Sequence, residues 1–373
     1  MPSAIVVGAG IAGLSVAATL AEETDVVVLE MEATPAHHAS GRSAALYIPT
    51  YGPPTIRRLT RASFDWLSSR GDGLADVDLI TPRSVMFAAD ADHLGHLRAT
   101  AAGMGDAGGT LHLLDAAETR DVCPALRPDW VVAGGIDRDA YDMDVAAIVG
   151  TFRRRLADLG GRVDLRRRVT DLTRSSTGWR VETTDGVVTC DVVVNAAGAW
   201  VDEVAALAGL DPLGFVPKRR TIGIGRVDPE AAATVGPAFV AHAAEQWYFG
   251  AEPGGVLFSP ADETPSAPCD ARPEEIDLAR ALDGIDTATS LGMRSVSSSW
   301  AGLRTFSPDG SIVVGADPDE PTFVWCGGQG GYGIHTCEAA ARATAAAALD
   351  LDLPADLDAV GLTFDDLGPG RLR

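Results

Sequence analysis

The stretch AIVVGAGIAG, residues 4–13, carries the strongest structural signal in this chain. It is an apolar run that ends in a G-x-G-x-x-G pattern, and small residues at helical spacing follow it as far as Leu20. In such a turn Gly8 permits a tight bend, Gly10 lets the backbone approach a pyrophosphate, and Gly13 lets the helix pack closely on the strand. The pattern therefore predicts strand, turn and helix, with a pyrophosphate held at the helix N-terminus.

A second apolar run, residues 26–29, ends at Glu30. A carboxylate at this place, about 20 residues beyond the turn, accepts hydrogen bonds from an adenosine ribose. It also disfavours a 2'-phosphate, so NADP is not expected. We predict a dinucleotide-binding unit, which on this pattern alone holds either FAD or NAD.

Three further stretches favour FAD over NAD. They are ASGRSAA (residues 39–45), VVVNAAGAW (192–200) and GGQGGYGIH (327–335). The first two offer small residues along which an extended cofactor can pass. The third places backbone amides at an expected helix start, where they can hydrogen-bond a flavin carbonyl or hold negative charge on a reduced ring.

Length and composition narrow the class of protein. The 373 residues exceed the usual size of one domain, and 46% hydrophobic with 22% charged residues is an ordinary globular balance. The net charge of -22 gives no basis for binding nucleic acid or anionic membranes. The five cysteines lack a paired spacing, so neither a disulfide framework nor a zinc site is indicated, and no metal is expected. With no basic leader and no apolar run of about 18 residues, we expect a cytoplasmic protein without a membrane span.

Apolar periodicity places the elements coarsely. We expect helices at residues 55–69, 141–160 and 338–349, and the end of another at 98–105. We expect strands at residues 162–165, 180–184, 187–196 and 323–326, and a surface loop at 259–273. The segments 81–141 and 215–300 contain short stretches of alternating residues separated by Gly and Pro, a pattern that is typical of antiparallel sheet.

The predicted fold class is α/β, with a Rossmann-like FAD-binding domain interleaved with an antiparallel-sheet substrate domain. The FAD-binding domain is expected at residues 1–80, 142–214 and 301–373. The substrate domain is expected at residues 81–141 and 215–300.

Taken together, these stretches resemble the FAD-dependent D-amino-acid oxidase superfamily, which includes glycine and sarcosine oxidases, from one end of the chain to the other. Within it, the strings GRSAA (41–45), YG (51–52), PKRR (217–220), WAGLR (300–304) and QGGYGI (329–334) resemble the bacterial D-arginine dehydrogenases most. The resemblance implies the interleaved fold named above, and FAD as cofactor. The family attaches FAD covalently through Cys or His, and residues 304–310 contain neither, so bound FAD is expected to be non-covalent.

The resemblance also implies which residues bind cofactor and substrate. It places the cofactor on Gly8, Gly10, Ala12, Gly13, Glu30, Met31, Ser40, Gly41, Arg42, Ser43, Ala44, Ala45, Leu46, Val169, Ala197, Gly198, Trp200, Gly330, Gly331, Tyr332, Gly333, Ile334 and His335. It places the substrate on Tyr51, Val85, Arg220, Tyr248, Arg304 and Gly331, and catalysis on Tyr51, Arg220, Tyr248, Arg304 and His335.

Arg220 and Arg304 would clamp the substrate carboxylate, since guanidinium forks bind carboxylates in bidentate fashion. Either arginine could instead form a structural ion pair with one of the many acids. Tyr51 and Tyr248 could equally be half-buried core residues. His335, where the relatives carry glutamine, could be a structural histidine.

Two departures from the dehydrogenases bear on the substrate. Val85 stands where they have a glutamate that pairs with a cationic side chain, and Leu46 stands where they have a histidine. Binding a cationic side chain in such a pocket without an acidic partner costs several kcal/mol of binding free energy, roughly as much as breaking a buried ion pair. D-Arginine and D-lysine are therefore expected to be poor substrates, and a neutral or apolar D-amino acid a better one.

The expected reaction is oxidative deamination. Hydride passes from the substrate α carbon to flavin N5, and the resulting imino acid hydrolyses to a 2-oxo acid and ammonia. The electron acceptor is quinone-like or oxygen; relatives that activate oxygen often use a lysine, and the only lysine is Lys218. Alternatives are a glycine or sarcosine type amine oxidase producing hydrogen peroxide, an NAD-linked dehydrogenase, and a flavin-containing accessory subunit without turnover. The oligomeric state is left open.

Overall fold

A computed structural model describes residues 3–104 and 109–373 of the chain. Its first layer is a mostly parallel sheet built from the start, middle and end of the sequence, as expected. In spatial order its strands are β20 (Val313–Ala316), β21 (Phe323–Gly327), β13 (Val192–Asn195), β1 (Ser3–Val7), β2 (Asp25–Leu29) and β9 (Arg162–Asp164). Only β20 runs antiparallel to its neighbour. Because β1 lies between β2 and β13, both the glycine turn and residues 195–200 emerge at one edge of this sheet.

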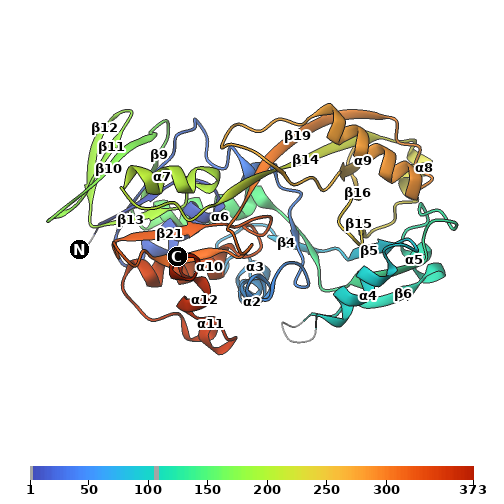
Figure 1. The fold of residues 1–373 in the computed structure, drawn as a ribbon, viewed down its shortest axis with the longest axis horizontal. Helices are drawn as coiled ribbons and strands as arrows, with labels where there is room; N and C mark the ends of the chain where they lie inside the picture. Colours follow the sequence, from blue (N-terminus) through green and yellow to red (C-terminus); the bar gives the residue numbers. More distant parts are fainter. Residues whose placement is uncertain (1–2, 105–108) are drawn as a thin grey trace.

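Small residues let the helices approach this sheet closely. α1 (Ile11–Leu20) is almost fully buried and packs against α6 (Val145–Asp158) and against α10 (Cys337–Ala348), which is rich in alanine. Figure 1 shows this sheet and its helices in one half of an elongated molecule.

The second layer is a large, mainly antiparallel sheet. Its strands are β18 (Thr264–Pro265), β14 (Val216–Arg226), β17 (Gly255–Ser259), β16 (Tyr248–Glu252), β15 (Phe239–His242), β5 (Val85–Ala89), β7 (Ala133–Asp137) and β6 (His112–Asp115), and β19 (Ser295–Phe306) pairs with β14. The pair β5 and β15 is parallel. In Figure 1 the long strands β14 and β19 cross from the half with the parallel sheet to the half with β5, β15 and β16.

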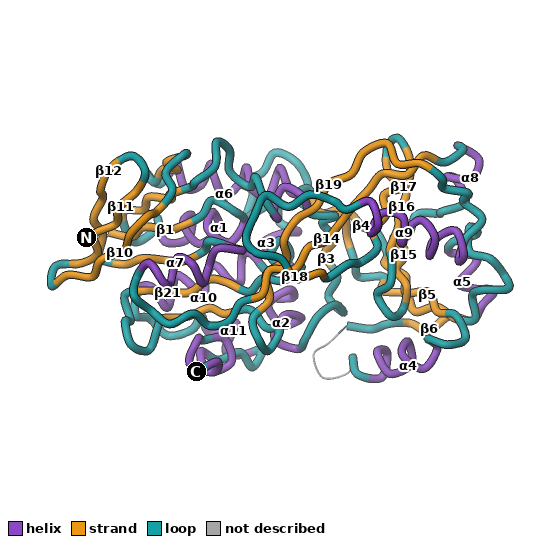
Figure 2. Tube along the Cα trace, turned by 45° about the horizontal axis from the view of Figure 1, so that its top comes forward, coloured by secondary structure: helices purple, strands orange, loops and turns teal. Residues whose placement is uncertain are grey.

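Two small sheets complete the strands. β10 (Val169–Ser175), β11 (Gly178–Thr183) and β12 (Gly186–Cys190) form an antiparallel meander, and β3 (Leu46–Tyr47), β8 (Tyr141–Met143) and β4 (Ile80–Pro82) form the other. The remaining helices are α2 (Pro54–Ala62), α3 (Phe64–Ser68), α4 (Leu94–Ala102), α5 (Ala116–Val122), α7 (Val201–Leu207), α8 (Pro229–Ala233), α9 (Glu275–Ala288), α11 (Ala355–Ala359) and α12 (Phe364–Leu367). Figure 2 shows α4, α5, α8 and α9 around the antiparallel strands.

Several expected boundaries are wrong, each for a local reason. The helix expected at 141–160 begins at Val145, because the Asp144 side chain accepts a hydrogen bond from the Ala147 amide and residues 141–143 pair as β8. The strand expected at 187–196 is two strands, β12 and β13, which belong to different sheets. The end of the helix expected at 98–105 is observed at Ala102, while residue 105 lies outside the described residues.

Within residues 215–300 one expectation is wrong and one is confirmed in large part. Residues 275–288 form the helix α9, whose apolar positions Ala281, Ile285 and Ala288 recur at helical spacing. Residues 259–273 are mostly irregular and at least partly exposed, as expected, except that Ser259 ends β17 and residues 264–265 form the short strand β18. The Asp262 carboxylate in this loop accepts a hydrogen bond from the Thr221 amide at 2.6 Å. The domain boundaries stay a prediction; β19 belongs to the antiparallel sheet and runs across the expected boundary at residue 301.

No helix in the described ranges combines the length and the apolar character needed to cross a bilayer.

Candidate active site

A row of adjoining cavities runs from the edge of the parallel sheet to the face of the antiparallel sheet. The first, about 390 Å³, is lined by Glu30 and reaches Gly10 and Ser40. Those two residues also line the second cavity, about 130 Å³, which reaches Arg304. Arg304 lines a third cavity too, about 90 Å³, which ends at Val85. Because neighbouring cavities share walls, the row suits one extended ligand followed by a small one.

The glycine turn has the shape that the sequence predicts. Gly8 has a φ of +101°, and a Cβ there would lie 2.7 Å from the Ala196 carbonyl oxygen. A Cβ on Gly13 would lie 1.8 Å from the Gly8 oxygen, and one on Gly41 would lie 2.4 Å from the Ala36 oxygen. Gly13 and Gly41 line none of these cavities, so they act by allowing close backbone packing rather than by touching a ligand.

Glu30 follows β2 directly and is buried, with 7% of its surface exposed. Its carboxylate accepts hydrogen bonds from the backbone amides of Ala9 at 2.7 Å and Glu32 at 2.8 Å. These two amides orient the acid at the wall of the first cavity, where a ribose hydroxyl can reach it. Ser40 lies at the start of α1, where its hydroxyl accepts from the Ile11 amide at 2.9 Å.

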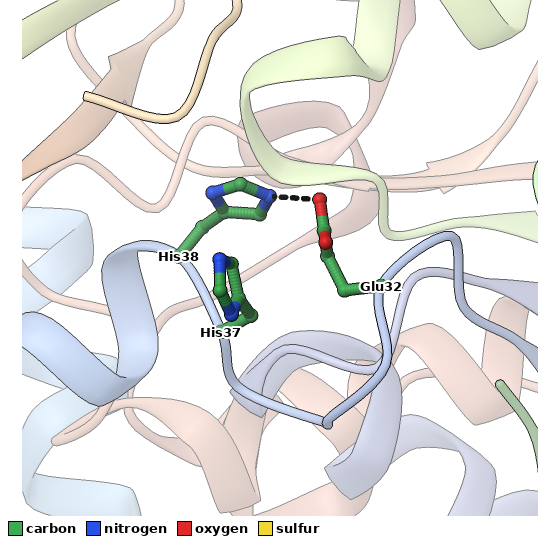
Figure 3. Close-up of side chains that lie close together, drawn as sticks. All are labelled: Glu32, His37 and His38. Carbon is green, nitrogen blue, oxygen red and sulfur yellow. Dashed lines mark hydrogen bonds and ion pairs between the residues drawn. The ribbon is translucent and has the colours of Figure 1, made fainter. Parts of the chain in front are cut away.

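Two histidines that the sequence reading missed lie at the rim of the first cavity. Figure 3 shows His37 and His38 beside Glu32, with His38 Nε2 hydrogen-bonded to Glu32 Oε1 at 3.1 Å. His38 also contacts the Trp200 ring, with 4.8 Å between ring centroids. The three side chains Glu32, His37 and His38 could hold a metal ion, as could Asp90, His93 and His242 elsewhere in the described ranges. Adjacent histidines in a loop carry no spacing signal that reveals such a cluster in the sequence.

Arg42 lines the first two cavities, but its charge is used by the protein itself. The guanidinium donates to the carbonyl oxygens of Ala301 at 2.9 Å and Ala271 at 3.0 Å, and it pairs with Asp270 at 2.5 Å. Arg42 therefore ties the loop after β2 to β19, which fixes the wall along which a cofactor lies.

Arg220 and Arg304 lie on neighbouring strands and on the same face of the sheet. Arg220 on β14 is directly opposite Gly302 on β19, and Arg304 is two residues further along β19. Since side chains alternate along a strand, the two guanidinium groups point to one side as diagonal neighbours. Both line the second and third cavities.

The two arginines differ in their partners. Arg220 donates from Nε to the Asp262 carbonyl oxygen at 2.8 Å, and its Nη2 pairs with Glu263 at 3.3 Å. Arg304 forms no ion pair with any described carboxylate, although it lies within the protein. Arg304 is only half-buried, and a guanidinium in such a place without an acidic partner is stabilised by an anion that compensates its charge. Arg304 therefore marks the position where an anionic ligand binds.

The tyrosines expected in the site line its cavities. The buried hydroxyl of Tyr248 has no hydrogen-bond partner among the described residues, and the Arg220 guanidinium lies 6.0 Å from the centre of its ring. Tyr51 donates to the Glu245 carboxylate at 3.1 Å. Burial raises the pKa of Tyr51, and the nearby guanidinium of Arg304 opposes this rise. Glu245 is a site residue that the sequence reading missed: it lines the cavity that contains Val85 and is exposed at its edge.

His335 lies at the inner wall of the third cavity, 2% exposed. Its Nδ1 is 3.1 Å from the hydroxyl of Thr60 on α2. Burial lowers the pKa of His335 to about 3, and the charge of Arg304 adds to this effect. The imidazole is therefore neutral at all physiological pH values.

The glycine cluster at residues 327–335 approaches Arg304 but does not begin a helix. A Cβ on Gly331 would lie 2.6 Å from Cζ of Arg304, so the backbone at Gly331 rests on the guanidinium. The helix that follows, α10, begins only at Cys337, so the expectation that residues 327–335 present helix-start amides is wrong. Tyr332 lines a separate cavity of about 320 Å³ on the far side of Tyr51.

Most of the residues expected to bind the cofactor are brought together along the row. Those that line its cavities are Gly8, Gly10, Ala12, Glu30, Met31, Ser40, Arg42, Ser43, Ala44, Ala45, Leu46, Val169, Ala197, Gly198, Trp200, Gly330, Gly331, Gly333, Ile334 and His335. The expected substrate residues Tyr51, Val85, Arg220, Tyr248, Arg304 and Gly331 all line the third cavity. Gly13, Gly41 and Tyr332 line none of the three.

Known structures share this architecture. L-proline dehydrogenase from P. horikoshii superposes with a TM-score of 0.81 at 16% identity, over 99% of this chain and 97% of that chain. Glycine oxidase from Bacillus cereus ATCC 14579 gives 0.81 at 20% identity, over 94% and 95%. L-amino acid deaminase from Proteus vulgaris gives 0.82 at 16% identity, over 100% and 97%. At these identities the likeness establishes the fold.

The sequence itself establishes the family. Residues 3–347 match the family model described as FAD dependent oxidoreductase (DAO). That match covers the glycine turn, Glu30, both arginines and the late glycine cluster. The chain therefore belongs to the FAD dependent oxidoreductase family and uses FAD as its cofactor.

Proposed function

We propose that this protein is a dehydrogenase that deaminates a neutral or apolar D-amino acid to a 2-oxo acid and ammonia, with FAD bound non-covalently. The observation that carries the proposal is the Arg304 guanidinium, which lies beside a cavity without a carboxylate partner in the described residues. Arg220 and the unpartnered hydroxyl of Tyr248 line the same cavity. A substrate carboxylate supplies the missing charge and accepts the available donors.

The residues along the row fit FAD. Glu30 is held open to the first cavity, Gly10 and Ser40 stand at the start of α1 beside the second, and residues 43–46 lead to the third. Bound there, FAD supplies the acceptor for the hydride of the substrate α carbon. No cysteine or histidine lies at residues 304–310, and this supports non-covalent attachment.

The chain itself contributes binding and orientation. The clamp fixes the carboxylate and so limits the positions that the α carbon can take. Tyr51 lines both the third cavity and the separate cavity of about 320 Å³, and its ring packs against that of Tyr332 with 5.2 Å between ring centroids. The amine must be neutral when hydride leaves, so the rate of reduction should rise with pH as the bound ammonium loses its proton.

The walls of the third cavity favour an apolar side chain. Val85 is 1% exposed, and Leu46, Ile48 and Phe239 lie around the same space. The acid at its edge, Glu245, already accepts a hydrogen bond from Tyr51. A neutral side chain leaves that bond intact, whereas a cationic one competes for the acid. The D configuration rests on the likeness to the D-arginine dehydrogenases.

The electron acceptor is proposed to be quinone-like rather than oxygen. Lys218, the lysine that could promote oxygen reactivity, pairs with Glu263 at 2.9 Å and lies over the Phe306 ring. It lines none of the cavities in the row. A cytoplasmic location is proposed on the pattern of unpaired cysteines.

The test is anaerobic mixing of the purified yellow protein with a panel of D- and L-amino acids while flavin absorbance is followed. Neutral D-isomers should bleach the flavin, and D-arginine should do so poorly. Faster reduction by D-arginine would contradict the assignment of the pocket, and faster reduction by L-isomers would contradict the configuration. Peroxide formation with sarcosine or glycine would instead identify an amine oxidase, and failure of every amino acid would identify an accessory subunit.

A further inference from the structure

The hydrogen bond between Thr60 and Nδ1 of His335 determines which ring nitrogen of His335 carries the proton. The Thr60 hydroxyl lies 2.8 Å from the carbonyl oxygen of Ile56, one turn earlier in α2, and 3.1 Å from Nδ1 of His335. A hydroxyl carries a single proton, and helical threonines donate it to the carbonyl four residues back. Thr60 therefore accepts from His335, and the proton of the neutral imidazole is on Nδ1.

The other ring nitrogen then presents a lone pair. No group in the described part of the chain hydrogen-bonds to Nε2, and His335 lines the cavity that Arg304 and Tyr248 also line. The rings of Tyr47 and Tyr332 contact the imidazole edge-on, at centroid distances of 6.4 and 5.9 Å. Burial raises the pKa of both phenols, so Arg304 is the charged group that acts on the imidazole. A neutral ring with this tautomer accepts a hydrogen bond from the cavity but donates none into it.

The cavity thus offers cationic donors for an anion and, in Nε2 of His335, a neutral acceptor that donates nothing into it. An amino acid bound by its carboxylate carries its α-amino group one carbon away, and that group is a hydrogen-bond donor when it is protonated or neutral. We infer that Nε2 of His335 accepts a hydrogen bond from the α-amino group of the substrate and so orients it beside the clamp. The inference rests on the proposed function, since it needs an amino acid on Arg304.

This role is one of positioning rather than of removing the proton. Burial and the charge of Arg304 lower the pKa of His335 to about 3, so the imidazole is neutral above that pH. It therefore cannot hold the ammonium proton near neutral pH. It can select the ligand, because a carboxylic acid that lacks the amino group leaves Nε2 without a partner. Discrimination between amino acids and plain carboxylates is therefore the property that His335 should control.

Two substitutions separate the two ring nitrogens. In His335→Asn the amide reaches the place of Nδ1, so it can still donate to Thr60, but nothing replaces Nε2. In His335→Gln the longer side chain carries an amide oxygen to the place of Nε2. The pair of variants therefore removes or retains the acceptor that faces the cavity.

The experiment uses the holoenzyme of wild type and both variants with two probes, D-alanine and propanoate, which differ by the amino group. Dissociation constants come from the concentration dependence of anaerobic flavin reduction for D-alanine, and from perturbation of the flavin spectrum for propanoate. A charge-assisted hydrogen bond of ordinary strength predicts about 10- to 100-fold weaker D-alanine binding in His335→Asn. Propanoate binding should change by less than about twofold, and His335→Gln should recover most of the D-alanine affinity.

Equal weakening of both probes in His335→Asn would show a structural role and overturn the inference. So would unchanged D-alanine binding, or a changed flavin spectrum in His335→Asn without any ligand, which would place the acceptor against the cofactor. If wild type binds propanoate but is not reduced by D-alanine or any other amino acid, the proposed function fails, and the inference fails with it.

Discussion

Replacement of Arg304 by methionine should abolish most of the activity without loss of stability. Methionine has a similar length and no charge, so it fills the space and removes a guanidinium that has no acidic partner in the described protein. Removing a half-buried charge that has no compensating partner is neutral or slightly stabilising for folding. We therefore expect the apparent melting temperature of Arg304→Met to stay the same or to rise by a few degrees.

The effect on catalysis follows from the hydrogen bonds that the fork would make to a carboxylate. Two charge-assisted bonds at about 1.5 to 3 kcal/mol each amount to about 3 to 6 kcal/mol. At about 1.4 kcal/mol for each factor of ten, kcat/KM should fall by about 10² to 10⁴. Arg304→Lys keeps the charge but loses the fork, so its activity should lie between the two.

Arg219 is a matched control because it is the neighbour of Arg220 on β14 and points to the opposite face. It pairs with Asp277, which is 3% exposed, at 2.8 Å, and also with Glu274. Arg219→Met leaves the buried Asp277 carboxylate without this partner, which costs about 3 to 5 kcal/mol when a buried pair is broken. It should lower the melting temperature and leave kcat/KM of the folded enzyme within about threefold.

The assays are thermal denaturation of the holoenzymes and steady-state turnover with an artificial electron acceptor. The opposite pattern would refute the reasoning: a large loss of stability in Arg304→Met would mean that the guanidinium supports the fold. A kcat/KM close to that of wild type would mean that the substrate carboxylate binds elsewhere.

Four further outcomes follow from other residues. Gly331→Ala should cut kcat/KM with little loss of stability, because its Cβ would lie 2.6 Å from Cζ of the flexible Arg304 side chain; a matched loss of melting temperature would contradict this. Gly13→Ala should lose both stability and bound FAD, measured by absorbance, because its Cβ would lie 1.8 Å from a backbone oxygen; a fully yellow variant would argue against close packing. Val85→Glu should raise kcat/KM for D-arginine relative to D-valine by at least about tenfold through a new charge pair, and no change in this ratio would show that Val85 does not face the side chain. Burial, reinforced by His93, lowers the pKa of His242 to about 4, so the unfolded chain binds more protons between about pH 6.5 and 4 and stability falls as pH drops through that window. His242→Asn, whose oxygen can still accept from the Ala244 amide, should flatten this part of a plot of melting temperature against pH, and an unaltered slope would assign the loss to other groups.

The fold could be predicted to a large extent because its signals are local. The glycine turn, Glu30 and the apolar runs that form β1, β2 and β13 determine a parallel nucleotide-binding sheet through the geometry of neighbouring residues. The helix α9 escaped prediction because it lies in a segment whose Gly and Pro content is typical of sheet, and its apolar positions were read as alternation.

The site could be predicted only where a motif carried it. Arg304 and Gly331 come from recognisable strings, but their contact depends on the ladder between β14 and β19 and on the turn before α10. Glu245 has no motif at all; it enters the cavity because the chain turns between β15 and β16 and places its carboxylate against Tyr51. The different partners of Arg220 and Arg304 are likewise invisible in the sequence, since Glu263 is distant from both strands along the chain.

The sequence by itself therefore determines the glycine turn after β1 and the placement of Glu30 after β2, which form the start of the cofactor site. Each is a short segment whose conformation depends on its own glycines and on the strand before it. The substrate cavity depends on contacts between residues that are far apart in the sequence, such as Thr60 with His335, 275 positions apart, and Tyr51 with Glu245, 194 positions apart. Those long-range contacts leave the charge of Arg304 unpaired in the described protein. They also determine which nitrogen of His335 faces the cavity. Only the folded chain brings them within hydrogen-bonding distance.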